Sequence, residues 1–440
     1  MEGGSPTRRV LMVAFHFPPQ KGSSGLQRTL RFVQYLRTHG WEPAVLTVWS
    51  RAYPACSDDQ LEEVPRDVPV VRAWAWDASR HFAFRGKYFG WMAVPDRWWS
   101  WILPAFVAGL LKVRRWRPAV LFSTSPIPSA QVVGWALQRA TGLPWIADLR
   151  DPLTGRASPA ASGWRHLVQS WVERLVARRA ARVLFTSFGA MDEFRGRYPL
   201  LPRERLVVIE NGYDEADFEA AARLVATAAA VPSNAPSESV RVLLHSGLVS
   251  STVRDPLPLL HALAALVKDG SLRVNGQRWR VLFRGSHAEH AYRNLTESLG
   301  LAEVVEWLPA LPYREALAEM LGADALLLMQ GVDNNPQVPA KLYEYARAGR
   351  PIIALVGNTS ESARWLRAAG EPMTAPLEDS LAISTRLPGF LRRVVEGGAE
   401  PIPTQLVAAL SREARTVRLA EVLDELLVVP AVSGINQGSR

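Results

Sequence analysis

Short, uninterrupted apolar runs alternate with amphipathic stretches along most of this chain, and this alternation constrains its fold more than any other feature. The apolar run at 10–15 precedes the stretch 26–37, in which Leu26, Leu30 and Val33 share one helical face. Strands that are apolar throughout are typical of parallel sheets covered by helices on both faces. The N-terminal half is therefore predicted to be a doubly wound α/β domain.

The same alternation restarts after a stretch rich in Ala, Ser and Pro. The predicted strands are 10–15, 44–48, 119–122, 145–148 and 183–186, followed by 240–245, 279–283, 304–308, 325–329 and 352–356. We predict two Rossmann-like domains, 1–219 and 240–402, joined by a linker at 220–239, with a helix in 403–440 that returns to complete the first domain. Ligands bind such sheets at the carboxyl ends of their strands, so we expect the two domains to face each other across a cleft.

Composition narrows the class of protein. Of 440 residues, 48% are hydrophobic and only 21% are charged, which excludes a chain that is mainly disordered. The net charge of +9 comes almost entirely from arginine and predicts anionic partners. Nucleic acid is disfavoured among these, because the charge is spread along the chain and no recognition motif accompanies it.

Cysteine content and hydropathy indicate the cellular compartment in which the protein is expected. The only cysteine, Cys56, excludes an intramolecular disulfide and a thiolate metal cluster, so a reducing, cytoplasmic setting is expected. The run at 10–15 is too short for a secretory signal. The longest apolar stretch, 98–111, is shorter than the roughly 20 residues that a membrane-spanning helix needs. A cytoplasmic or peripheral membrane protein is expected.

The loop between the first strand and the first helix is the first candidate site. Gly22 and Gly25 permit a close approach of the backbone, and the following helix N-terminus offers N–H groups to an anion. The loop matches neither the dinucleotide-binding fingerprint nor the phosphate-binding loop of nucleotide hydrolases. A plain glycine-rich turn is the alternative.

The end of the strand at 145–148 is the second candidate. Asp148 and Asp151 flank Arg150, a grouping that could orient hydroxyls and hold a charge. A self-satisfied surface ion pair is the alternative at equal weight. The chain has no Asp-x-Asp pair, so a metal-dependent nucleotide-sugar site is not expected.

The third candidate is the segment 330–351, which lies between two apolar runs. Its helix is predicted to begin near Pro339 and to end at Gly349. Glu344 lies early in this helix, where a carboxylate can accept from the two vicinal hydroxyls of a ribose while the helix N-terminus favours a diphosphate. A solvated surface glutamate is the alternative.

Several short motifs, taken in order, resemble those of the family 4 glycosyltransferases of the GT-B fold, and the resemblance runs from Val10 to about Leu427. The residues that carry it are Phe17-Pro18-Pro19 with Gly22, Gly25 and Arg28, then 123–126, 148–152, 210–214, 245–247, 339–345 and 349–351. Such enzymes transfer a sugar from a nucleotide-diphosphate donor to an acceptor, usually with retention and without a metal. The bacterial surface-polysaccharide type is the expected branch, within the hexosyltransferase class.

The resemblance also implies roles for individual residues. Glu344 matches the second glutamate of the family's paired motif, which grips the donor ribose, whereas Gln337 stands at the first. Arg254 lies near the second basic position that holds the diphosphate, and Leu248 occupies the first. Arg150 stands where many members carry a catalytic histidine. The expected catalytic residues are Arg150, Asp151 and Asp148. The expected donor-binding residues are Gly22, Gly25, Gly247, Arg254, Gln337, Lys341 and Glu344, with no metal and no further cofactor.

Two other functions stay open. A catalytically weak GT-B protein could serve as a binding subunit of a polysaccharide-assembly complex, and a nucleotide-sugar epimerase would share the two-domain architecture. The stretches 148–152 and 210–214 fit a transferase better than an epimerase.

Aromatic and basic residues crowd the segments 80–91 and 96–104, which are followed by the basic stretch 112–117. Tryptophans settle at the headgroup level of a bilayer and basic residues favour an anionic surface. This pattern predicts a peripheral enzyme on the cytoplasmic face of an anionic membrane, with a glycan acceptor that is lipid-linked. The alternative is that the tryptophans form core, which we expect for about half of them because tryptophan is highly buried on average.

Overall fold

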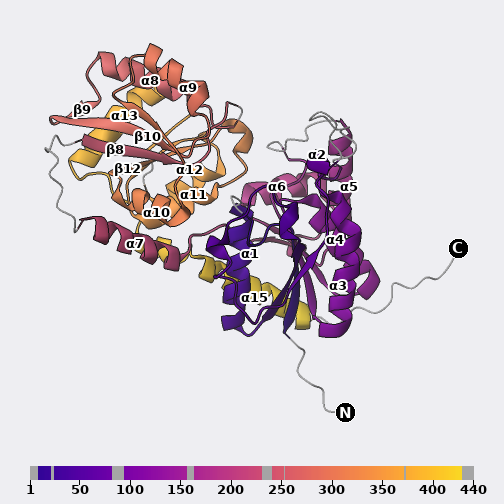
Figure 1. Cartoon of the computed structure of the whole chain (residues 1–440). Helices are drawn as coiled ribbons and strands as arrows, with labels where there is room; N and C mark the ends of the chain where they lie inside the picture. Colours follow the sequence, from indigo (N-terminus) through magenta and orange to yellow (C-terminus); the bar gives the residue numbers. More distant parts are fainter. Residues whose placement is uncertain are drawn as a thin grey trace. The chain divides into compact units, whose positions relative to one another are not determined.

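The computed structural model of the chain describes residues 8–20, 24–81, 94–155, 163–229, 240–251, 253–370 and 373–428. The chain forms two compact units (Figure 1). The first consists of Met1–Glu210 with Arg412–Arg440, and the second of Asn211–Ser411. Each unit has its own sheet and its own core, as predicted from the repeated alternation.

The first unit is built on a seven-stranded, wholly parallel sheet in the order β3-β2-β1-β4-β5-β6-β7. Its strands are β1 (Arg9–Ala14), β2 (Glu42–Val48), β3 (Val70–Ala73), β4 (Val120–Thr124), β5 (Trp145–Arg150), β6 (Arg182–Phe185) and β7 (Leu206–Val208). Its helices are α1 (Ser24–Tyr35), α2 (Ala78–His81), α3 (Ile102–Trp116), α4 (Pro128–Thr141), α5 (Gly163–Arg179), α6 (Phe188–Arg197) and α15 (Arg412–Val428).

Two helical layers cover this sheet, because successive residues of a strand point to opposite faces. Leu11 and Val13 of β1 pack in the core that includes α3, α4 and α5. Val10 and Met12 pack in a second core, formed with α1 and with α15 from the C-terminal end of the chain. The sheet is therefore buried on both faces, which explains why its strands are apolar throughout.

The second unit has a mainly parallel sheet in the order β11-β10-β8-β12-β13-β14, and β9 pairs antiparallel with β10. Its strands are β8 (Val240–Ser246), β9 (Arg273–Val274), β10 (Gln277–Arg284), β11 (Val305–Leu308), β12 (Ala325–Met329), β13 (Ile352–Leu355) and β14 (Met373–Ala375). Its helices are α7 (Glu215–Ala229), α8 (Leu257–Lys268), α9 (Glu289–Ser298), α10 (Tyr313–Gly322), α11 (Ala340–Ala348), α12 (Glu361–Ala369), α13 (Ser380–Val395) and α14 (Thr404–Ala408).

Local sequence explains several helix ends in this unit. Pro339 is the N-cap residue of α11, one position before the first helical turn in which it was expected. Gly349 ends the helix in the left-handed conformation, with φ at 66°, which glycine adopts without strain. Ser360 and Asp379 cap α12 and α13 by accepting from the N–H groups of Ala363 and Ala382.

The boundaries between the units differ from the predicted ones. The chain enters the second unit after Glu210, and α7 packs against α10 there. Glu215 of α7 forms an ion pair with Arg347, so α7, which includes the first half of the stretch 220–239, is part of the second unit. At the C-terminal end, the expected single helix is two: α14 belongs to the second unit, and only α15 returns to the first.

The aromatic segment before α3 lies mostly in the core. Trp98 is 8% exposed and Trp101 is fully buried, and both pack against Phe15, whereas Trp99 is exposed. Trp91 lies outside the described residues. Within the described residues, no helix is both long and apolar enough to cross a membrane.

The packing of α15 predicts that the stability of the first unit depends on this helix. Leu423 is fully buried in the core shared with α1 and β1. Leu423→Ala should lower the free energy of unfolding of the first unit by about 2–5 kcal/mol, the usual cost of a large cavity. Chemical denaturation measures the loss, and amide hydrogen exchange should place the lost protection in β1 and β4.

The matched control is Val417→Ala on the exposed side of the same helix, which should change stability by less than about 0.5 kcal/mol. Lost protection confined to 211–411 after Leu423→Ala would contradict the assignment of α15 to the first unit.

Candidate functional site

A buried carboxylate organises the carboxyl edge of the first sheet. Asp148 is fully buried in β5, and both its oxygens accept from Arg28 of α1, at 3.2 Å from Nε and 3.1 Å from Nη2. The hydroxyl of Thr124, at the end of β4, also donates to Asp148, at 2.7 Å. Burial alone would raise the pKa of Asp148, but the positive charges of Arg28 and Arg150 outweigh it and lower the pKa below its usual value.

Arg150 ends β5 in an unusual backbone conformation. Its φ of 64° lies in the left-handed region, and the ladder to β6 shifts register between Asp148 and Arg150. The side chain is 12% exposed and donates from Nη2 to the Gly25 carbonyl and to the Thr124 hydroxyl, both at 2.9 Å. A non-glycine residue held in this conformation costs free energy that its surroundings must supply, and such sites are common at functional centres.

Two further titratable groups lie beside Arg150. Burial raises the pKa of Asp151 to about 6, although Arg150 and the hydroxyl of Thr186 partly offset this effect. Burial and the charges of Arg150 and Arg97 lower the pKa of His16, just after β1, to about 4. At neutral pH this edge therefore presents a neutral imidazole, a guanidinium and a carboxylate together.

The carboxyl edge of the second sheet carries a partly buried lysine. Lys341, in the first turn of α11, places Nζ 3.5 Å from Nε2 of His245, at the end of β8. Gly247 follows β8 with φ at 122°, and a methyl group on it would lie 2.6 Å from Lys341 Nζ. Only glycine fits this backbone and leaves room for the lysine. His245 Nδ1 meets the Leu327 carbonyl at 2.9 Å.

Electrostatics makes this lysine unusual. Burial, with the charge of Arg254 as the second cause, lowers the pKa of Lys341 to about 7, and Glu344 only partly restores it. Burial and Lys341 also lower the pKa of His245 well below 6.5, so the imidazole stays neutral. Within the described residues, the buried Nε of Arg254 has no hydrogen-bond partner. Cationic groups thus converge at this edge, and among the described residues neither Lys341 nor Arg254 forms an ion pair within 4.0 Å, which suits an anionic ligand.

Glu344 and Tyr345 lie on the turn of α11 that follows Lys341. Glu344 is half-buried, and Tyr313 of α10 donates its hydroxyl to Oε1 at 2.7 Å. The hydroxyl of Tyr345 accepts from the Ser246 N–H at 2.9 Å, which ties α11 to the end of β8. Burial raises the pKa of Tyr345 above its usual value, so it stays protonated.

Gln337 belongs to a different network, in the loop before α11. Its side-chain oxygen accepts from Asn334 at 2.9 Å, and its carbonyl accepts from the buried Gln330 at 2.9 Å. Ser362 of α12 donates to Gln330. The loop 330–337 is therefore held by amide groups where the resemblance predicted a carboxylate.

The structure brings most of the predicted residues into two groups, one in each unit. Asp148, Arg150, Asp151 and Gly25 form the first group, while Gly247, Arg254, Lys341 and Glu344 form the second. Gly22 lies outside the described residues. The first group also contains residues to which we gave no role from sequence, namely Arg28, Thr124, Thr186 and His16, and the second adds His245 and Tyr313.

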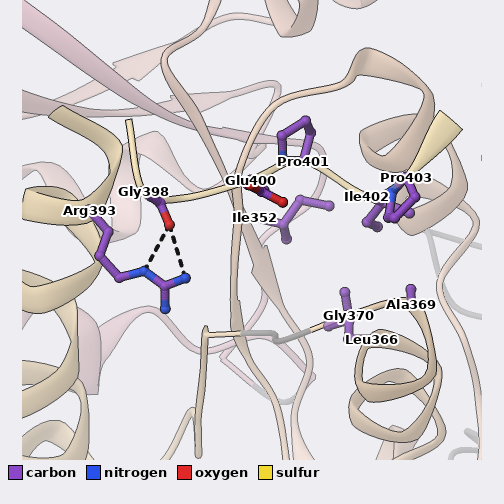
Figure 2. Close-up of a pocket in the computed structure, with 10 residues that line it drawn as sticks. All are labelled: Ile352, Leu366, Ala369, Gly370, Arg393, Gly398, Glu400, Pro401, Ile402 and Pro403. Atoms are coloured by element: carbon purple, nitrogen blue, oxygen red, sulfur yellow. Dashed lines mark hydrogen bonds between the residues drawn. The ribbon is translucent and has the colours of Figure 1, made fainter. Parts of the chain in front are cut away.

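A cavity of about 360 Å³ lies at the opposite edge of the second sheet (Figure 2). Its lining includes Ile352, the first residue of β13, and Gly370, just after α12. Arg393 is already occupied there by the Gly398 carbonyl. Because ligands bind open α/β sheets at the carboxyl ends of the strands, this cavity is not part of the candidate site. No group of three or more metal-binding side chains occurs among the described residues.

Sequence comparison identifies part of the chain. Residues 25–212 match the profile of the glycosyl transferase 4-like domain, a range that covers the first unit from α1 onward. No curated protein matches the chain in sequence.

Solved structures resemble the whole chain. Sucrose-phosphate synthase from Thermosynechococcus elongatus aligns with a TM-score of 0.64 over 96% of this chain and 99% of its own, at 15% identity. HepE from Anabaena, solved with UDP and glucose, aligns at 0.62 over 95% and 100%, at 14% identity. A glycosyltransferase from Rickettsia africae aligns at 0.65 over 97% and 100%, at 13% identity. The fold is GT-B, as predicted.

The buried pair of Arg28 and Asp148 predicts a strong effect on stability. Asp148→Asn removes the negative charge that faces two guanidinium groups, so it should destabilise the first unit by about 3–5 kcal/mol at neutral pH. Chemical denaturation measures the loss. Asp192→Asn, which breaks the exposed pair with Arg195, should cost less than about 1 kcal/mol. Equal effects of the two substitutions would contradict an organising role for Asp148.

Proposed function

We propose that this protein transfers a sugar from a nucleotide-diphosphate donor to a glycan acceptor, with retention and without a metal. The glycosyl transferase 4-like domain supports the reaction class. The observation that carries the proposal is the cationic group at the carboxyl edge of the second sheet, where a partly buried lysine and an arginine lie near Gly247, whose backbone conformation disfavours any side chain.

The donor diphosphate is assigned to Gly247, Lys341 and Arg254. Lys341 supplies a compact charge beside the Gly247 backbone, and Arg254 supplies a planar donor fork. Leu248, at the expected first basic position, is 56% exposed and offers no charge. Lys341, in the neighbouring helix α11, supplies the positive charge instead. HepE was solved with UDP and glucose, which is consistent with a donor of this class.

Glu344 is assigned to the donor ribose. It lies one turn after Lys341, so a ribose next to the diphosphate would meet its carboxylate. The hydroxyl of Tyr313 fixes one carboxylate oxygen and thereby limits the orientations of the group. Gln337, held in the amide network before α11, is assigned to the hydroxyls of the donor sugar.

The first unit is assigned to the acceptor and the transfer step. Arg150 and Asp151 are assigned to the transferred sugar, and Asp148 holds Arg150 in place through an ion pair at 3.5 Å. In a retaining transferase without a metal, fixed donors must meet the charge of the leaving group. Gly25 lies in the first turn of α1, where an anion is favoured. Gly22 is assigned to the same loop on the sequence alone. The acceptor is a glycan carried on a lipid.

Turnover tests this proposal directly. The purified protein is incubated with a panel of nucleotide sugars and with membrane extracts as acceptor, and released nucleotide diphosphate is measured. One donor should yield nucleotide diphosphate and a labelled glycan. Asp151→Asn should lower kcat by about 100-fold, as expected for a group that acts on protons in the transfer step, and should leave donor affinity within about twofold.

Other outcomes distinguish the alternatives. Tight nucleotide binding without turnover of any donor would favour a binding subunit, and conversion of one nucleotide sugar into another without an acceptor would favour an epimerase. Equal losses of kcat and of donor affinity in Asp151→Asn would contradict the role of Asp151.

The lowered pKa of Lys341 predicts how donor binding depends on pH. The free protein carries the Lys341 charge below pH 7 and loses it above, whereas a bound diphosphate stabilises the charged form. Donor affinity should therefore be constant below about pH 6.5 and should fall by up to about tenfold per pH unit above 7. Calorimetric titration with the intact nucleotide sugar measures this, since its diphosphate does not titrate in that range.

Lys341→Met is the control. It should weaken binding at pH 6 by about 10- to 100-fold, the equivalent of a charged hydrogen bond, and should abolish the pH dependence. His245 cannot produce this dependence, because its pKa lies well below 6.5. A pH dependence that survives in Lys341→Met would contradict the assignment.

A further inference from the structure

Helix α5 exposes a row of large apolar side chains to solvent. Trp164 is 72% exposed, Leu167 is 61% exposed, and Trp171 is also exposed. Their spacing of three and four residues places them on one side of the helix. The opposite side, with Val172 and Val176, is buried against the sheet. A row of this size on the surface of a soluble unit marks an interaction site.

Helix α3 carries a second row of the same kind. Leu103 is 69% exposed, and Val107 and Leu111 follow it at intervals of four residues. Trp99, just before the helix, is exposed as well. The other side of α3 packs Ala105 into the core. The two rows thus occur on two helices of one layer.

These two helices flank α4, so their rows belong to one surface. Contacts join α3 to α4 and α4 to α5, and Figure 1 shows the three helices side by side. Trp135 of α4 meets Trp171 of α5 with their ring centroids 6.2 Å apart. We call this surface the α3–α5 face and define it by the exposed residues of these helices together with Trp99.

The charge on the α3–α5 face has one sign. Helices α3 and α4 contain no Asp or Glu, and the single carboxylate of α5, Glu173, is buried and bonded to Thr154 and Arg197. The exposed charged residues of the three helices are all arginines: Arg114, Arg115, Arg139, Arg165, Arg174, Arg178 and Arg179. Within the described part of the chain, none of these arginines forms an ion pair.

The apolar half of this face lies at the edge that carries the candidate site. Trp101, at the start of α3, packs on Phe15, which directly follows β1. Thr154, shortly after β5, hydrogen-bonds to Glu173 in the second half of α5, so the first half of that helix extends past the sheet edge. Trp164 and Leu167 therefore project beyond the edge that holds Asp151, while the arginines at the helix ends lie at the far end of the face.

We propose that the α3–α5 face docks on an anionic lipid surface, with its tryptophans and leucines at the headgroup level and its arginines on the lipid phosphates. Exposed tryptophans and leucines, together with arginines that form no ion pair among the described residues, are typical of a protein surface that binds the membrane–water interface. Two copies of this face would bring like charges together, so self-association is disfavoured. Docked in this way, the protein holds the edge with Arg150 and Asp151 next to the membrane.

This arrangement differs from the one predicted from sequence. Trp98 and Trp101 are core residues, and the segment 82–93 lies outside the described residues. Trp99 and the basic end of α3 remain on the docking surface, and α5 adds Trp164, Leu167 and Trp171, to which no role was given from sequence. That docking delivers a lipid-linked acceptor rests on the proposed function, whereas the docking itself does not.

Vesicle flotation tests the docking without any donor. The full chain is mixed with vesicles of phosphatidylcholine, with or without phosphatidylglycerol, at low and at high salt. It should float with the anionic vesicles at low salt, and less so at high salt. Trp164→Ser combined with Leu167→Ser should lower the partition coefficient by at least about tenfold. Arg178→Ser combined with Arg179→Ser should weaken flotation with anionic vesicles only.

Matched controls come from exposed leucines outside the face. Leu200→Ser in the first unit and Leu381→Ser in the second should float like the intact protein. All substituted side chains are exposed, and circular dichroism verifies that each variant is folded. No flotation of the intact protein with anionic vesicles at low salt would overturn the proposal, as would equal flotation of the Trp164/Leu167 variant. A dimer that this variant abolishes would instead assign the face to a second copy of the chain.

The two proposals fail separately. A protein that turns over donor with a soluble acceptor but does not float refutes only the docking. A protein that floats but turns over no donor refutes only the proposed reaction.

Discussion

The first unit depends on one buried ion pair, between Arg28 and Asp148. A carboxylate that is buried away from water is stable only with charged and hydrogen-bonding partners. For Asp148 these partners come from α1 and β4, which precede β5 in the sequence. Arg28 also donates to the carbonyl of Glu210 at 3.0 Å, and the Glu210 side chain pairs with Arg415 of α15 at 2.6 Å. These bonds therefore connect the carboxyl end of β5 with Glu210, the last residue before the second unit, and with α15.

The second unit uses the opposite electrostatic arrangement. Lys341 and Arg254 are partly buried, and within the described ranges neither forms an ion pair with a carboxylate, so burial lowers the pKa values of both. His245 remains neutral beside them and adds no further repulsion. This desolvation is a cost of folding that the proposed diphosphate would offset by stabilising the charged forms.

The fold could be predicted from the sequence, whereas the site could be predicted only in part. Apolar runs of a few residues reveal buried parallel strands because both faces of each sheet are covered, and the predicted strands at 325–329 and 352–356 agree with β12 and β13 to within a residue. The strands β3, β7, β9 and β14 were missed, since each has only two to four residues and is too short to form a pattern. The partner of Asp148 was also missed, because no local pattern links residue 28 to residue 148.

In the proposed donor site, Lys341 supplies a positive charge that the resemblance places at another position in the sequence. The resemblance places a basic residue at 248, where this chain has an exposed leucine. The Nζ of Lys341 approaches the backbone of Gly247 from α11, where a methyl group on residue 247 would lie 2.6 Å from it. Comparing motif positions one by one would score this site as incomplete, because the lysine lies nearly a hundred residues away in sequence. The position of the charge in space, rather than the position of its residue in the chain, decides whether a diphosphate can be held.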